Sequence, residues 1–195
     1  MPIIDVHNHF YPPEYLDALR SGKSVVRVTV DSAGNPHIHY PGDYNVAVAG
    51  HRDIAYRHNV LEDAGVDTQV ISLTTPGTHV ESPAYAVTLA KLVNDAFATI
   101  IAERSPRFTA LATLPLNDPV ASLAEFRRAV EELHLPGAML FSNVNGVALA
   151  DARFEPLYAE ANRLGFRHIV LRRDIPAIPR YVERGILTWG QVRET

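Results

Sequence analysis

The sequence predicts an α/β protein in which a parallel β-sheet is covered by helices. Two observations carry this prediction: short, nearly continuous apolar runs recur along the chain, and amphipathic stretches with helical spacing separate them. Strands buried on both faces lack polar alternation, and parallel neighbours need crossover connections that are usually helical. The chain has 195 residues, of which 47% are hydrophobic, so it can form one domain with a substantial core.

The expected strands are identified by their apolar runs and by the polar or turn residues that bound them. They cover residues 3–7, 67–73, 108–114, 137–142 and 166–171. A separate segment, residues 25–40, alternates apolar and polar residues on both sides of Gly34-Asn35-Pro36. This alternation is typical of a β-hairpin, which is inserted here after the first strand.

The expected helices lie between the strands, at residues 51–64, 83–104, 119–134 and 151–164. Pro83 suits the first turn of its helix, and Asp118 and Asp151 suit the N-cap position of theirs. Gly65 and Gly165 follow helical stretches and can end them. The apolar stripe of the longest helix consists of Leu89, Leu92, Val93, Ala96, Phe97 and Ile100.

Composition excludes several classes of protein. The formal net charge is −4 without a basic block, so we expect no nucleic-acid partner, because nucleic-acid binding usually needs clustered Lys and Arg. There are no cysteines, so any metal must be bound by His, Asp or Glu. We expect no membrane-spanning run and no secretory leader, since the first residues lack a basic segment. The predicted location is the cytoplasm.

Two histidines at the end of the first expected strand are the clearest candidate for a functional site. Alternate residues of a strand point to the same side, so His7 and His9 can converge beyond the strand's carboxyl end. Imidazole is the common nitrogen ligand for zinc and similar divalent ions. Asp5 lies on the same side and could orient a ligand imidazole by accepting a hydrogen bond. The alternative is a strand end where His7 bonds only a loop.

Several segments resemble the amidohydrolase superfamily, in the "amidohydrolase 2" branch that includes aminocarboxymuconate semialdehyde decarboxylase. They are DVHNHFYPPEYLDAL at the N-terminus, DAGVDTQVISLTTPG (63–77), VNDAFATIIAERSPRFTALATLPLNDP (93–119) and FEPLYAEANRLG (154–165). The resemblance covers roughly residues 3–165. It implies a (β/α)₈ barrel with one divalent metal, usually Zn²⁺, that activates a water. His7 and His9 match the two ligands of the family's first strand.

The resemblance also has departures. The family's fifth strand ends in a ligand histidine, and that position is Leu171 here, while His168 has the opposite parity. The family's later ligands fall beyond the end of this sequence. Its substrate-binding arginine after the hairpin aligns with Asn45. We therefore expect an incomplete barrel of about five βα units over residues 1–171, with a divergent tail at 172–195.

Weaker candidates for substrate contact follow later strands. His79 lies in the loop after the second expected strand, and Asn143 and Asn145 follow the fourth. Loops after barrel strands line the sites of such folds. His37 and His39 form a second pair of histidines two residues apart, which we interpret as part of a solvated hairpin.

The leading functional hypothesis is a metal-dependent enzyme that decarboxylates or hydrolyses a small organic acid or carbonyl compound. No residue is assigned as the catalytic acid or base. The alternative is a non-catalytic fragment or subunit that retains the first half of the fold and assembles with another chain. An open sheet edge predicts association, so a homo-oligomer is expected.

Overall fold

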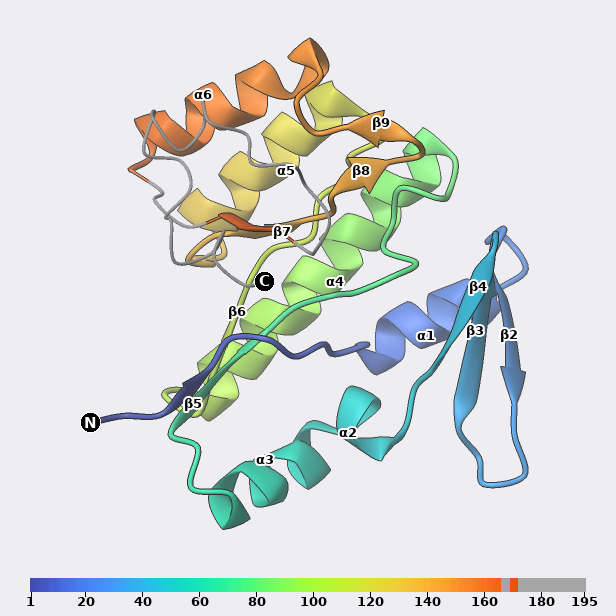
Figure 1. The fold of residues 1–195 in the computed structure, drawn as a ribbon, viewed down its shortest axis with the longest axis vertical. Coiled ribbons are helices and arrows are strands. Elements are labelled where there is room, and N and C mark those ends of the chain that lie inside the picture. The colour runs from blue at the N-terminus through green and yellow to red at the C-terminus, as the bar shows by residue number, and fades with distance from the viewer. Residues whose placement is uncertain (166–168, 172–195) are drawn as a thin grey trace.

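Parallel strands follow one another in chain order through the molecule (Figure 1). The computed structural model describes residues 1–165 and 169–171. The parallel strands are β1 (Ile4–Asp5), β5 (Thr68–Ile71), β6 (Phe108–Ala110), β7 (Ala138–Leu140) and β10 (Ile169–Leu171). β5 pairs with β1 on one side and β6 on the other, and β7 pairs with β10, in parallel throughout.

A single parallel bridge joins these two groups of strands. Ala112, just beyond β6, lies opposite Ala138 of β7. The Ala112 N–H donates to Gly137 O (2.8 Å), and the Met139 N–H donates to Ala112 O (2.9 Å). The strands therefore follow the order β1, β5, β6, β7, β10. The predicted parallel arrangement is confirmed, although the hydrogen-bonded strands are shorter than the apolar runs.

The helices connect successive strands, as the sequence predicts. They are α1 (Pro13–Arg20), α2 (Ala49–Arg52), α3 (Ile54–Asp63), α4 (Pro83–Arg104), α5 (Pro119–Glu131), the 3₁₀ helix η1 (Ala152–Phe154) and α6 (Glu155–Arg163). The Asp118 carboxylate caps α5 by accepting from the Ala121 N–H at 2.9 Å. Gly65 follows α3 with a φ of 68°, a left-handed conformation that favours glycine at a helix end.

One prediction about the helices was wrong, and one helix was not predicted. The expected helix over residues 51–64 is divided at Asp53, whose extended backbone ends α2 and whose carboxylate caps α3. Helix α1 was not predicted from the sequence, although Pro13 stands at its first position. Its buried residues, Tyr15, Leu16 and Leu19, pack into the core, and this burial rather than a long helical repeat stabilises the short helix.

The predicted hairpin is part of a three-stranded antiparallel sheet. Its strands are β2 (Arg27–Val30), β3 (Pro36–Tyr40) and β4 (Asp43–Val46), in that order. Figure 1 shows this sheet on one side of α4, with α5 and α6 on the other. A short antiparallel pair, β8 (Asn143–Val144) and β9 (Val147–Ala148), follows β7.

Helix α4 is the longest helix and belongs to the core. By length and composition alone it could cross a membrane, as the core helix of a folded domain often can. Its buried side includes Leu89, Val93 and Phe97, and the helix contacts α1, β6 and α5. Helix α4 therefore buries its apolar side against neighbouring elements, as a core helix does.

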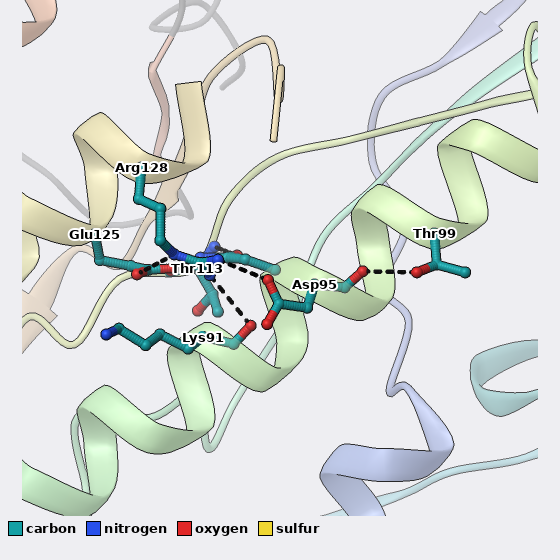
Figure 2. Close-up of polar contacts among 7 residues, drawn as sticks. Lys91, Asp95, Thr99, Thr113, Glu125 and Arg128 are labelled. Atoms are coloured by element: carbon teal, nitrogen blue, oxygen red, sulfur yellow. Dashed lines mark hydrogen bonds and ion pairs between the residues drawn. The ribbon is translucent and has the colours of Figure 1, made fainter. Parts of the chain in front are cut away.

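A buried polar network ties α4 to α5 and to the segment after β6 (Figure 2). Asn94, fully buried, accepts from the Thr113 N–H (2.8 Å) and donates to Thr113 O (2.9 Å) and Glu125 Oε1 (2.7 Å). Arg128 donates to both carboxylate oxygens of Glu125 (2.9 and 2.8 Å) and to Asp95 (2.7 Å). The buried Glu125 carboxylate is thereby paired and fully engaged, which burial of a charge requires.

Candidate metal centre

His7 and His9 lie in the loop that follows β1. The hydrogen-bonded part of the strand ends at Asp5, so strand alternation does not place the two histidines as expected. Their rings nevertheless lie together, with centroids 5.6 Å apart and planes inclined by 74°. His7 is exposed and His9 is half-buried. The loop brings the two imidazoles close together beyond the carboxyl end of β1.

Ser72 determines which nitrogen of His9 carries the proton. The Ser72 hydroxyl donates to the main-chain oxygen of Asn8 (3.0 Å), so its oxygen is the acceptor for His9 Nδ1 at 3.2 Å. His9 Nδ1 is therefore the protonated nitrogen, and the lone pair of the neutral ring lies on Nε2. A hydrogen bond from one ring nitrogen is the usual way in which proteins orient a metal-binding imidazole.

The Asp5 carboxylate organises the main chain rather than an imidazole. It accepts from the His7 N–H (3.1 Å) and from the Gln69 side-chain amide (2.6 Å). The sequence-based prediction assigned Asp5 to a ligand ring, whereas in the structure its carboxylate bonds the backbone of His7 and the Gln69 side chain of β5. Asp5 thus fixes the start of the loop between β1 and α1, residues 6–12, which we call the histidine loop.

The two histidines supply some, but not all, of the ligands that a metal site needs. Two neutral imidazoles are suitable ligands for a divalent ion, and a catalytic zinc usually has three protein ligands. Among residues 1–165 and 169–171, no group of three or more His, Asp or Glu side chains is arranged to hold a metal. Strand β10 ends at Leu171. His168 lies outside the described residues.

His79 is buried in the loop after β5 and packs against Phe141, with ring centroids 4.7 Å apart. Only 8% of His79 is exposed, and within the described part of the chain its Nδ1 has no hydrogen-bond partner. Gly77 makes this packing possible, because a Cβ there would stand 2.9 Å from the Phe141 ring. Burial lowers the pKa of His79 to about 4, so the ring is neutral at pH 7.

His79 is expected to make stability depend on pH. The unfolded chain protonates this ring near its ordinary pKa of 6.5, whereas the folded protein resists protonation down to about pH 4. The contribution of neutral His79 to the free energy of unfolding is therefore fully present above pH 6.5. It falls as the pH drops towards 4, by at most roughly 3 kcal/mol. Urea unfolding of His79→Gln should show a shallower acid slope. His37→Gln is the matched control, and an equal change in both variants would contradict the prediction.

Asn143 and Asn145 differ in their relation to His79. Asn143 is exposed, and its side-chain oxygen accepts from the Gly146 N–H (3.1 Å) within the β8–β9 turn. Asn145 donates to the main-chain oxygen of His79 (2.7 Å). The structure therefore connects His79 to Asn145, while Asn143 stabilises the turn. Substrate contact by His79 and Asn143 stays a prediction.

Asn45 joins the hairpin sheet to the loop after β5. Its amide donates to Thr75 O (2.6 Å), Thr75 Oγ1 (2.9 Å) and the Tyr11 hydroxyl (2.9 Å). Tyr11 also donates to Thr75 O at 2.7 Å. These contacts hold β4 against the segments that follow β1 and β5.

The second histidine pair lies entirely within the hairpin sheet. The rings of His37 and His39 are 6.2 Å apart, and both stack with Tyr44. His37 Nε2 lies 3.4 Å from Asp31, and His39 Nε2 lies 2.9 Å from Thr29 Oγ1. The two pairs thus share a sequence pattern but have different surroundings.

Sequence reasoning missed Arg57, Gln69 and Ser72, which surround the histidine loop. Gln69 and Ser72 are polar residues inside the apolar run 67–73, and a polar residue in a buried strand needs a partner. That signal could have identified both. Arg57 lies in a helix with many charged residues, where nothing in the pattern distinguishes it.

Comparison with known proteins places these features in a family. A family model described as "Amidohydrolase" matches residues 4–179. The chain is 39% identical over 102 residues to 2-amino-3-carboxymuconate-6-semialdehyde decarboxylase of Dictyostelium discoideum, covering 51% of this chain and 28% of that protein. It is 31% identical over 178 residues to gamma-resorcylate decarboxylase of Rhodococcus jostii, covering 89% of this chain and 48% of that protein.

A solved structure shows the same fold. The crystal structure of a dihydroxybenzoic acid decarboxylase from Polaromonas, with bound manganese and 2-nitroresorcinol, superposes with a TM-score of 0.64 at 21% identity. The match covers 94% of this chain and 53% of that one. The chain spans about half the length of such relatives, or less. The expected TIM-barrel-like α/β fold is confirmed at this level, and the chain belongs to the amidohydrolase family, in the branch that includes aminocarboxymuconate semialdehyde and gamma-resorcylate decarboxylases.

Proposed function

We propose that this chain forms the first half of a metal-dependent decarboxylase that acts on a small, unsaturated or aromatic carboxylic acid. The observation that carries the proposal is the paired His7 and His9 imidazoles beyond the end of β1. Their chemistry agrees with relatives whose names specify decarboxylation of gamma-resorcylate and of an aminocarboxymuconate semialdehyde. The net reaction releases the carboxylate as CO₂ and places a proton on the carbon that held it.

His7 and His9 would hold one divalent ion. When bound, the ion would supply Lewis-acid polarisation and activate a water. Zn²⁺ is the expected ion, and Mn²⁺ is a second candidate because a structural relative contains manganese. The chain's own contribution is orientation: Ser72 accepts from His9 Nδ1, so that Nε2 carries the lone pair for the metal.

Other residues would shape the substrate site. If His79 lines the site as predicted, its neutral, buried ring would help to keep water away from the reacting carbon. Asn143 remains a candidate for contact with the substrate. By the resemblance, Asn45 stands where the family has a substrate-binding arginine, so another group would have to bind a substrate carboxylate.

The proposed assembly is a barrel that needs further strands. In the described residues, β1 has only β5 as a hydrogen-bonded neighbour. Ile3, Ile4 and Val6, in and beside β1, are 57%, 54% and 59% exposed. We propose that these side chains are covered by later strands of a longer chain or by a second chain, and that residues 1–171 form the barrel part.

Isolated in water, this chain is expected to associate through the open edge of β1. Unpaired N–H and C=O groups beside exposed apolar side chains are a template for further strand pairing. Light scattering of the purified chain should give a mass above that of a monomer. Val6→Lys should reduce association, and Val120→Lys, at an exposed position of α5, is the control. A stable monomer of the unmodified chain would contradict this expectation.

Two measurements test the proposed function. The first is elemental analysis of the purified chain, which should give about one divalent ion per chain if the site assembles. The second is CO₂ release from gamma-resorcylate with added Zn²⁺ or Mn²⁺. Metal without CO₂ release would support the alternative of a non-catalytic subunit that retains the site. Neither metal nor CO₂ release, in this chain and in any longer form of it, would overturn the proposal. We propose the cytoplasm as its location.

A further inference from the structure

Arg57 is a buried arginine whose guanidinium lies beneath the histidine loop. Only 7% of the residue is exposed, and it lies in the second turn of α3. Its donors reach oxygens on three separate segments: Gly50 O (2.6 Å), Asn8 Oδ1 (2.7 Å), Gln69 Oε1 (3.1 Å) and His9 O (2.5 Å). The cation also stands 5.4 Å from the centre of the Phe10 ring.

These contacts are unusual for a buried charge, because none of them is made with a carboxylate. Burial lowers the pKa of Arg57 to about 10, and the charge of Asp5 opposes this effect. Removing a guanidinium from water is unfavourable, so neutral oxygens must compensate for it. An apolar residue in the same space would leave the four oxygen acceptors of the guanidinium without this donor. The guanidinium therefore serves to connect these acceptors, beyond filling the core.

The acceptors of Arg57 indicate that purpose. Three consecutive residues of the loop, Asn8, His9 and Phe10, each contact the guanidinium, through a side-chain oxygen, a main-chain oxygen and a ring face. Arg57 thus fixes the His9 carbonyl. Ser72 makes two further contacts with the loop: its hydroxyl accepts from His9 Nδ1, and its main-chain carbonyl accepts from the Phe10 N–H at 2.9 Å.

We propose that Arg57 is a positioning residue that orients His9 for metal binding. It acts through the main chain of the loop and does not itself touch the metal or the substrate. With the His9 carbonyl and the Asn8 amide fixed, the imidazole can pivot only about its own side-chain bonds, and Ser72 restricts that motion. The proposal rests on the proposed metal site at His7 and His9.

The test compares Arg57→Lys with Arg52→Met. Lysine keeps the positive charge and the aliphatic stem but cannot reach four acceptors with one ammonium group. Arg52 is the matched control, because it lies on the neighbouring helix α2 and donates to Ala47 O (3.0 Å), away from the histidine loop. We expect Arg57→Lys to weaken Mn²⁺ and Zn²⁺ binding about 10- to 100-fold, and Arg52→Met to leave it unchanged.

A second readout needs no metal. Nitrogen-15 NMR of the imidazoles reports the tautomer of His9, and hydrogen exchange reports protection of the Phe10 amide. In Arg57→Lys we expect mixed tautomers at His9 and faster exchange at Phe10, while amides of α5 stay protected. Low millimolar guanidinium added to Arg57→Ala should restore both signals in part. These changes support positioning even if the unmodified chain binds no metal, in which case only the proposed metal function fails.

Unchanged metal affinity, tautomer and Phe10 exchange in folded Arg57→Lys would overturn the proposal. If that variant does not fold, Asn8→Ala provides a second test, because it removes the Asn8 contact with Arg57 and the Asn8 bond to Val70 O (3.0 Å) but keeps Arg57 and its other partners. A loss of stability spread equally over all amides, with His9 unchanged, would assign Arg57 a purely structural role and would also overturn the proposal.

Discussion

The double replacement His7→Ala/His9→Ala is expected to abolish stoichiometric binding of a divalent ion. Both imidazoles are lost, and the described residues hold no group of three or more His, Asp or Glu side chains that could bind the metal in their place. Each single variant should also lose most of its metal, since one remaining imidazole is a weak ligand at neutral pH. Elemental analysis after dialysis measures the effect directly. CO₂ release, if the unmodified chain catalyses it, should fall to background.

The chain contains its own control for this experiment. His37 and His39 have the same two-residue spacing, but they bond to Asp31 and Thr29 within the hairpin sheet. His37→Ala/His39→Ala should therefore leave the metal content unchanged. Metal loss in the hairpin variant, with retention in the His7/His9 variant, would reverse the assignment of the site. Equal partial loss in both would indicate adventitious binding by surface histidines.

Arg128→Ala is expected to lower the free energy of unfolding by about 3 kcal/mol. The Glu125 side chain is 1% exposed, and Arg128 supplies its charged partner (Figure 2). After the substitution, the amide of Asn94, at 2.7 Å, is the one donor to the carboxylate that remains within the described part of the chain. A buried charge that loses its partner costs far more than the pair contributed. Urea denaturation measures the change.

Two further variants distinguish an unpaired buried carboxylate from lost packing as the cause of the expected destabilisation. Arg20→Ala removes an exposed pair with Asp17, and it should change stability by less than about 1 kcal/mol. The double variant Glu125→Gln/Arg128→Met removes the buried charge together with its partner, and keeps an acceptor for Asn94. It should be more stable than Arg128→Ala. If the double variant is as unstable as the single one, lost packing rather than an unpaired carboxylate is responsible.

The sequence by itself determined the succession of strands and helices and the identity of the histidine pair. Continuous apolar runs specify strands buried on both faces, and residues such as Asp118 and Gly65 mark helix ends by local hydrogen bonding and backbone preference. These signals act over a few residues, so they can be read along the chain. The short helix α1 was missed because burial, not periodicity, stabilises it. The division at Asp53 was missed because a capping aspartate can also occur within an apparently continuous helical pattern.

Only the tertiary structure decided how His7 and His9 are supported. Beyond the two residues of β1, no strand alternation determines where a side chain points. His9 is held by Ser72, 63 residues away, and by Arg57, 48 residues away. An arginine on a polar helix has the same local pattern whether its guanidinium faces water or the core. The choice depends on which oxygens the fold brings together at that point, and that information is absent from local sequence.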